Sequence, residues 1–227
     1  MTTHSEHNAN HRLKVRAHAV SAAMLLGLFA LADARAQEAG NACGPVTIPG
    51  HYGPYDYVSE RGKLPIVEQF HFTPKVEALV AGQSGSVGGD ISYTLNASPN
   101  HHRALVALMR LGARTKSLQP PGATLSIECF FDRAIRFRPK DTVVRTLFGL
   151  YLAQIQHMPE AMRQLEAATI LAGDDGFAQF NIGLAYFDLE QFDHALRHAH
   201  SVMKMGLQPT LLIDKLKSAN RWKEPAE

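Results

Sequence analysis

Histidine side chains are the residues of this sequence best suited to chemistry. His101 and His102 are adjacent in the stretch SPNHHRAL (98–105), directly before a run of leucines, and His71 lies in a separate segment. Imidazoles bind transition metals and exchange protons near neutral pH. If these three histidines converged, they would form a polar pocket or a metal site.

The same stretch also has a purely structural interpretation. Ser98 is a natural helix N-cap and Pro99 a natural first helical residue. Asn100 and the two histidines would then fill the first turn. Neighbouring helical side chains diverge by about 100°, so His101 and His102 cannot both face one point. Capping gives no reason for two histidines, so the alternative stays open.

No other group of residues predicts an active site. His194 and His198 are one helical turn apart, which suits zinc, but no third ligand is evident and we expect both to face solvent. The sequence has no GxSxG, P-loop, CxxCH or catalytic Cys–His signature. We therefore expect a protein that is not an enzyme and that carries no cofactor.

Composition and the first 36 residues indicate export. The formal net charge of +2 gives no basic footprint for nucleic acid. Basic residues at 12–16 precede an apolar run at 17–32 and the small-x-small sequence Ala34-Arg35-Ala36, the three parts of a secretory signal. We predict cleavage after Ala36, with an uncleaved anchor as the alternative. No later segment is expected to span a membrane, so the predicted location is periplasmic or secreted.

The two cysteines, Cys43 and Cys129, fit an exported protein. An even cysteine count in such a protein predicts a disulfide, which would tie the N-terminal tail to the helical body. One alternative is a buried thiol and a loose one. A second is lipid attachment at Cys43, although residues 40–42 lack the usual leucine.

The second half of the chain contains a 34-residue repeat. Gly149 and Gly183 are separated by this interval, and so are Ala161 and Ala195. TLFGLYL (146–152) aligns with FNIGLAY (180–186). This pattern resembles the tetratricopeptide repeat (TPR), a helix-turn-helix unit, although Gln179 replaces the family tryptophan. The resemblance implies a mainly α fold in which hairpins stack into a superhelix.

The repeat extends upstream and is closed downstream. Leu111-Gly112 supplies the glycine motif of an earlier unit, and SLQPPGA (117–123) lengthens its turn. We predict repeats at 98–140, 141–175 and 176–208, followed by a capping helix and tail at 209–227. Small residues let paired helices approach closely, so glycine on one helix should meet alanine on the other. The predicted packing residues are Gly112, Ala134, Gly149, Ala161, Ala168, Gly183 and Ala195.

Residues 37–97 predict a small irregular or α+β segment. The alternation in PIVEQFHF (65–72) indicates a short strand, although Glu68 interrupts its apolar side. Thr73 and Pro74 predict a helix that ends at Gly82. The glycine-rich loop at 82–89 is no dinucleotide fingerprint, because DISYTL (90–95) is typical of a strand or extended segment.

This N-terminal part resembles uncharacterised exported TPR proteins of proteobacteria. The matching stretches are YGPYDY (52–57), the VE-x-x-HFTP pattern at 67–74, DISYTL and PNHHRAL (99–105). The resemblance implies an exported repeat protein without an established activity.

The repeats predict a partner-binding groove. In peptide-binding members of the family, an asparagine at the position of Asn181 hydrogen-bonds the main chain of an extended partner, although the wording NIGLAY also occurs without a known ligand. An apolar stripe on the same helix is either buried core or binding surface. A further alternative is that residues 44–97 pack over this stripe. The predicted groove residues are Phe177, Phe180, Asn181, Leu184, Phe187 and Asp188.

Three functions remain open at this point. The first is a scaffold that binds a protein or peptide partner in the cell envelope. The second is a small-ligand or metal-binding protein that uses His71, His101 and His102. The third is an accessory subunit of an envelope transport or assembly complex, which would use the same groove as the scaffold.

Overall fold

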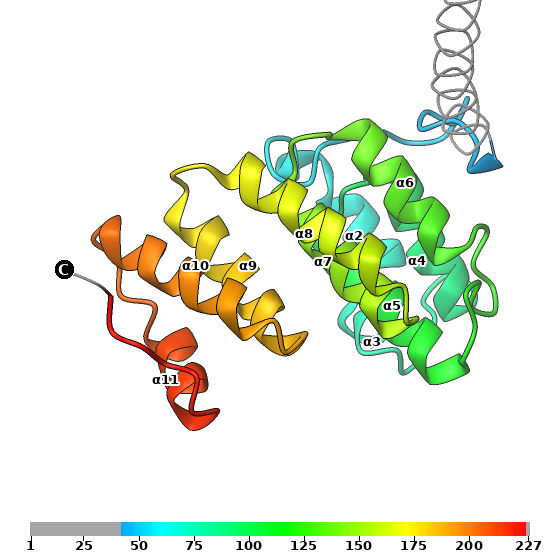
Figure 1. Cartoon of the computed structure of the whole chain (residues 1–227). Helices are drawn as coiled ribbons and strands as arrows, with labels where there is room; N and C mark the ends of the chain where they lie inside the picture. Colours follow the sequence, from blue (N-terminus) through cyan, green and yellow to red (C-terminus); the bar gives the residue numbers. More distant parts are fainter. Residues whose placement is uncertain (1–41, 226–227) are drawn as a thin grey trace, which may run out of the picture. The chain divides into compact units, whose positions relative to one another are not determined.

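Helices form the regular secondary structure of residues 42–225, the part of the chain that the computed structural model describes (Figure 1). The chain divides into residues 1–44 and 45–227, and η1 and the helices α2 to α11 belong to the second unit. The predicted signal at 1–36 lies outside the described residues. The elements are η1 (Arg61–Lys63), α2 (Pro65–His71), α3 (Pro74–Glu77), α4 (Val87–Ala97), α5 (His102–Thr115), α6 (Ile127–Phe137), α7 (Thr142–Gln154), α8 (Met158–Ala172), α9 (Gly176–Asp188), α10 (Phe192–Lys204) and α11 (Thr210–Ser218).

The strand predicted at 65–72 is wrong, because this segment is helix α2. Pro65 occupies its first turn, where a proline costs no hydrogen bond. Val67 is the buried residue of the helix. Ile66 and Phe70, four residues apart, are exposed instead of alternating into a core. The apparent period of two therefore arose from Ile66 and Phe70, which the fold leaves at the surface, together with Phe72, which is buried beyond the end of the helix.

The second predicted strand, at 90–95, is also wrong. It lies within helix α4, whose N-cap Ser86 accepts a hydrogen bond from the backbone N–H of Gly89. Ile91 and Leu95, one turn apart, are buried on one face. A helix thus does follow the glycine-rich loop, contrary to the expectation. The shorter helix α3 begins at Pro74 as predicted, but ends at Glu77 rather than Gly82.

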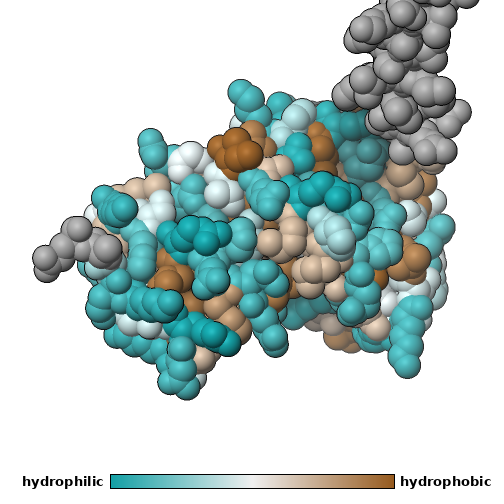
Figure 2. All heavy atoms as spheres, in the orientation of Figure 1, coloured by the Kyte–Doolittle hydropathy of each residue, from teal (hydrophilic) through white to brown (hydrophobic). Residues whose placement is uncertain are grey.

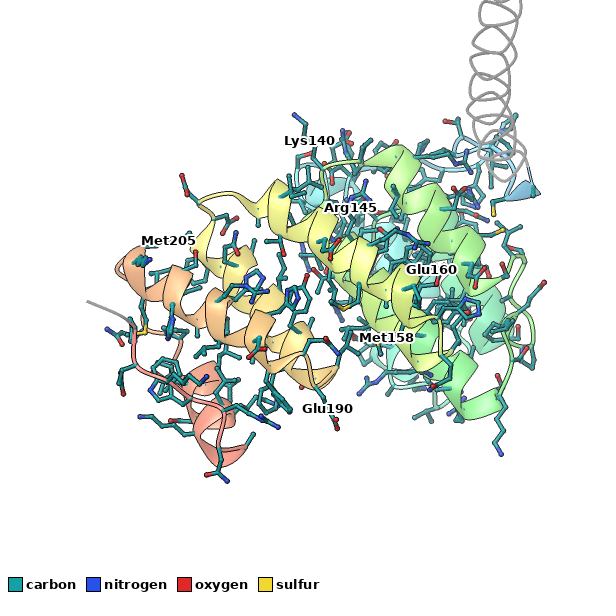
Figure 3. The ribbon with its side chains drawn as sticks, viewed as in Figure 1. Lys140, Arg145, Met158, Glu160, Glu190 and Met205 are labelled. Carbon is teal, nitrogen blue, oxygen red and sulfur yellow. The ribbon has the colours of Figure 1, made fainter. Side chains whose placement is uncertain are left out.

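The rest of the chain is helical, and its packing is compatible with a helical repeat. Three successive hairpins are α5 with α6, α7 with α8, and α9 with α10; α5 also packs on α4 and α7, and α11 packs against α9 and α10. The most extensive packing is within the second and third hairpins. In Figure 1, α8 and α10 lie in front of α7 and α9. Figure 3 shows Met158, the first residue of α8, and Glu190, in the α9–α10 turn, at the ends of these helices opposite Lys140 and Met205.

The repeat glycines lie at close approaches between elements. A Cβ on Gly149 would come within 2.9 Å of Leu165 and 3.1 Å of the Ala161 carbonyl oxygen. A Cβ on Gly183 would come within 2.8 Å of His198 Cβ and 2.6 Å of Leu212. The expected need for a small residue is therefore present. The contact of Gly183 is with His198 and the capping helix, rather than with the predicted Ala195.

Two hydrophobic clusters form the core. One extends from Phe72 through α4, α5 and α6 to α7, and the other joins α8, α9, α10 and α11. The predicted packing alanines, Ala134, Ala161, Ala168 and Ala195, are all fully buried.

The structure also bears on the cysteines and on the absence of a membrane span. The predicted disulfide is confirmed, since Cys43 and Cys129 are both disulfide-bonded. Within residues 42–225, no helix has the length and hydrophobicity needed to cross a membrane.

Candidate functional site

A groove of about 510 Å³ opens between α7 and α9, the first helices of the second and third hairpins. Four of the predicted residues line it: Phe177, Asn181, Leu184 and Asp188. No residue of 45–97 is among its lining residues, so the N-terminal segment does not fill it. The facing helix contributes Thr142, Val143, Thr146, Leu147 and Leu150.

Phe177 and Asn181 are presented to solvent in this groove. Phe177 is 73% exposed, which is unusual for a phenylalanine in a packed helix. The Asn181 side chain is exposed and makes no hydrogen bond within residues 42–225. Asp175 begins the helix by accepting the backbone N–H groups of Phe177 and Ala178 on Oδ1. Neither groove side chain therefore has a structural role that would explain it.

The other two predicted phenylalanines belong to the core instead. Phe180 packs against the cluster formed by α8 to α11. Phe187 contacts Phe192, with ring centroids 5.4 Å apart, and Lys215 Nζ lies 4.8 Å from its ring centroid. The predicted stripe thus divides into groove residues and residues that hold α10 and α11 in place.

The repeat register identifies groove residues that sequence reasoning missed. Asn181 precedes Gly183 by two residues, and Leu147 and Arg110 stand in the same relation to Gly149 and Gly112. Leu147 lines the groove, and Arg110 lines an adjoining depression of about 200 Å³ between α5 and α7. The spacing to each glycine was the available signal for these residues.

The predicted helix start at Ser98 is wrong, because α5 begins at His102 and its N-cap is His101. The backbone N–H of Ala104 donates to His101 Nδ1 at 3.1 Å. Nε2 therefore carries the proton, and it lies 3.1 Å from Glu68 Oε1 as a donor. His101 is fully buried, and burial lowers its pKa to about 3, so it is a neutral capping residue.

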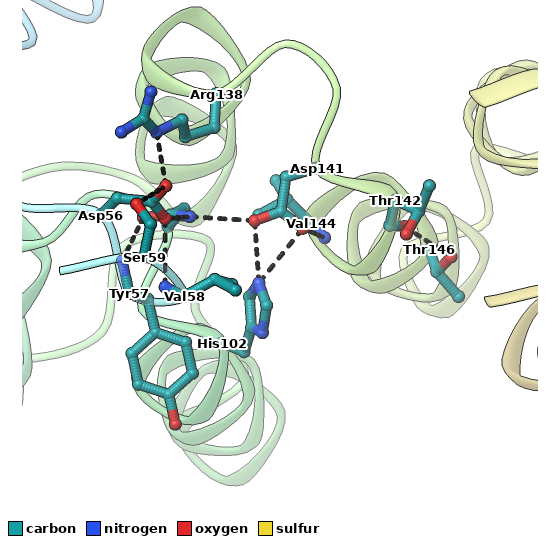
Figure 4. A network of polar contacts seen from close by, with 11 residues as sticks. Asp56, Tyr57, Val58, Ser59, His102, Arg138, Asp141, Thr142, Val144 and Thr146 are labelled. Carbon is teal, nitrogen blue, oxygen red and sulfur yellow. Dashed lines mark hydrogen bonds and ion pairs between the residues drawn. The ribbon is translucent and has the colours of Figure 1, made fainter. Parts of the chain in front are cut away.

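His102 belongs to a polar network that joins three segments (Figure 4). Its Nε2 lies 2.8 Å from Asp141 Oδ2, and Asp141 Oδ1 accepts the backbone N–H of Val144 to cap α7. Asn100 Nδ2 donates to both Asp141 and Asp56 at 2.9 Å. Burial raises the pKa of Asp141, but the hydrogen bonds from His102 and Asn100 outweigh it and hold the pKa below its usual range.

At the other end of this network, the Asp56 carboxylate is also fully hydrogen-bonded. It accepts hydrogen bonds from the Val58 backbone and the Ser59 hydroxyl, and the Arg138 guanidinium lies 2.8 Å away. A pocket of about 530 Å³ borders the network, between the α6–α7 turn and the segment around Asp56. The polar groups of the network already hydrogen-bond one another. The network therefore explains how these segments are held together.

His71 pairs with a different carboxylate, that of Asp90. Its Nδ1 lies 3.0 Å from Asp90 Oδ1, and Asp90 also accepts backbone N–H groups from Gln83, Ser84 and Gly85. The His71 ring stacks on Tyr93 at a centroid distance of 3.7 Å. This cluster fixes the loop between α3 and α4.

The three candidate histidines are therefore not brought together around one point. His71, His101 and His102 face Asp90, Glu68 and Asp141 respectively. Residues 42–225 contain no set of three His, Cys, Asp or Glu side chains placed to hold a metal ion.

His194 and His198 lie in a pocket of about 520 Å³ between α8 and α10. The expectation that both face solvent is wrong for His198, which is 5% exposed and whose Nε2 lies 3.3 Å from the Thr169 hydroxyl. Burial lowers its pKa to about 4. Figure 2 shows that the face carrying α8 and α10 is largely hydrophilic with scattered apolar patches.

Comparisons with protein-family models, with curated proteins and with solved structures found no match to this chain.

Proposed function

We propose that this protein is an exported, non-enzymatic TPR-type scaffold that binds an extended segment of a protein partner in the groove between α7 and α9. The observation that carries the proposal is the open groove itself, where Phe177 and Asn181 are exposed together. An exposed aromatic side chain beside a free amide supplies apolar contact and main-chain hydrogen bonding, the two requirements for holding an extended peptide.

Two further observations support the proposal. Hairpins that recur along the chain and end in a capping helix provide the rigid stack from which peptide-binding scaffolds are built. The disulfide of Cys43 and Cys129 fits an oxidising compartment such as the periplasm. An accessory subunit of an envelope complex would use the same groove, so the identity of the partner decides between these two roles.

Affinity purification from an envelope extract of the producing bacterium tests the proposal. The test variant combines Phe177→Ala with Asn181→Ala, two exposed positions whose change leaves the core intact. Ile170→Ala is the matched control, because Ile170 is an exposed apolar residue outside the groove. A partner retained by wild type and control but lost from the double variant supports the groove. Equal retention by all three proteins contradicts it.

A further inference from the structure

The α7/α9 groove adjoins the α5/α7 depression. Val143 and Leu147 of α7 line both hollows, so the two lie on either side of one apolar ridge. A segment that crosses this ridge would contact the first helices of all three hairpins.

The unpaired charges of these two adjoining hollows have opposite sign. Over α5, Arg103 is neutralised by Glu77, whose carboxylate accepts its guanidinium, and His102 faces Asp141. Arg110 is exposed and forms no ion pair within the described part of the chain, although its charge, after that of Arg103, helps to lower the pKa of Glu77. The charge left open at this end is therefore positive.

Over α9 the charged groups of the groove lining are both carboxylates. Asp175 uses only Oδ1 to cap the helix, which leaves Oδ2 for a ligand. Asp188 is exposed, but its carboxylate is paired with Lys215 Nζ at 3.2 Å, so among the described residues Asp175 carries the unpaired negative charge of this hollow. No Lys or Arg is among the residues that line this hollow.

We infer that the groove selects an extended segment with an acidic residue over α5, apolar side chains over α7 and a basic residue over α9. This inference rests on the proposed function and adds the chemistry and orientation of the partner. Complementary charge at both ends discriminates against segments of uniform charge, since one end of such a segment would always meet a like charge. The two pairs together are expected to change affinity by about tenfold.

Panning of a random dodecapeptide phage library against the purified, oxidised protein tests the inference. Enriched peptides are expected to carry an acidic residue on one side of an apolar stretch and a basic residue on the other, in a fixed order. Arg110→Glu should replace the acidic preference by a basic one. Asp175→Asn, which keeps a capping side chain, should weaken the basic preference. Arg163→Glu, at an exposed position of α8 outside the groove, should leave both preferences unchanged.

The possible failures are distinguishable. Enrichment that depends on Phe177 and Asn181 but shows no charge preference, or a preference unchanged by Arg110→Glu, overturns the polarity and leaves the peptide-binding function standing. Absence of any enrichment over the Phe177→Ala, Asn181→Ala double variant contradicts both the polarity and the proposed function.

Discussion

The N-terminal helices and the groove helices use polar side chains in opposite ways. Around α2 to α5, Asn100 and His101 are buried, and their side chains are bonded to groups from other segments. On α9, Asn181 is exposed and unbonded beside the exposed Phe177. Buried polar groups need partners and so stabilise a fold, whereas free polar and aromatic groups in a hollow are available to a ligand. Polar side chains of the first region therefore hold the structure together, and those of the second are available for recognition.

Replacing one asparagine of each region by alanine is the sharpest test of this difference. Asn100→Ala removes hydrogen bonds to Asp56, Asp141 and the Tyr57 backbone, and leaves two carboxylates without their shared donor. We expect the free energy of unfolding to fall by about 3 kcal/mol. Asn181→Ala should change it by less than about 0.5 kcal/mol. Urea unfolding measures both values, and equal losses would contradict the division.

The buried histidines should make stability depend on pH. The pKa of His101 is about 3 and that of His198 about 4 in the folded protein, against an ordinary value of 6.5. Between these values the unfolded chain binds more protons, so stability is complete above pH 6.5 and falls as pH decreases. The expected loss at pH 5 is about 2 kcal/mol for each histidine.

His101→Asn tests the share of one histidine in that loss. Asparagine retains the N-cap but cannot be protonated, so the loss between pH 7 and pH 5 should fall by about half. The carboxylates Asp56, Asp90 and Asp141, whose pKa values are lowered, lose their contribution only below their ordinary value of 3.8. Denaturant unfolding at pH 5 and pH 7 measures the difference, and an unchanged pH dependence in the variant would be evidence against a buried neutral His101.

A smaller effect is expected where the hairpins meet the capping helix. Gly183→Ala places a Cβ within 2.8 Å of His198 and 2.6 Å of Leu212. Overpacking costs about 1–3 kcal/mol and alanine regains up to about 1 kcal/mol of helix propensity, so a net loss near 1 kcal/mol is expected. Gly62→Ala is the control, because nothing lies within 4 Å of its added Cβ. A thermal-unfolding midpoint for Gly183→Ala at or above that of wild type would show that the junction is loosely packed.

The smallest effect on stability should come from the groove itself. Phe177→Ala removes a side chain that is largely exposed, so the free energy of unfolding should change by less than about 0.5 kcal/mol. A loss above about 1.5 kcal/mol in urea unfolding would mean that Phe177 is part of the core. It would then give no support to the groove.

The helices of the second half could be predicted from sequence because their signal is local and periodic. The glycine and alanine spacing predicted three helical hairpins followed by a further helix, and Asn181 and Phe177 line the groove that it led us to expect. The same register would also have located Arg110. Phe180 and Phe187 pack against the core, the alternative left open for this stripe, because helical spacing alone does not separate a groove face from a core face.

The N-terminal region could not be predicted in the same way, because distant contacts determine it. Glu68 and Asp141, the partners of His101 and His102, lie 33 and 39 residues away along the chain. His101 became the N-cap of α5 because its ring is held between Glu68 and the Ala104 backbone, which no short motif specifies. Pairs of this kind decide why two histidines are adjacent, and they become visible only in the folded chain.

Site-specific photocrosslinking tests the central claim most directly. Benzoylphenylalanine is introduced in place of Phe177 in one sample and in place of Ile170 in another, and each protein is irradiated in intact producing cells. Position 177 is expected to form a discrete adduct with an envelope protein, Asn181→Ala to reduce this adduct, and position 170 not to form it. The same adduct from both positions, or none from position 177, would contradict a partner-binding groove between α7 and α9.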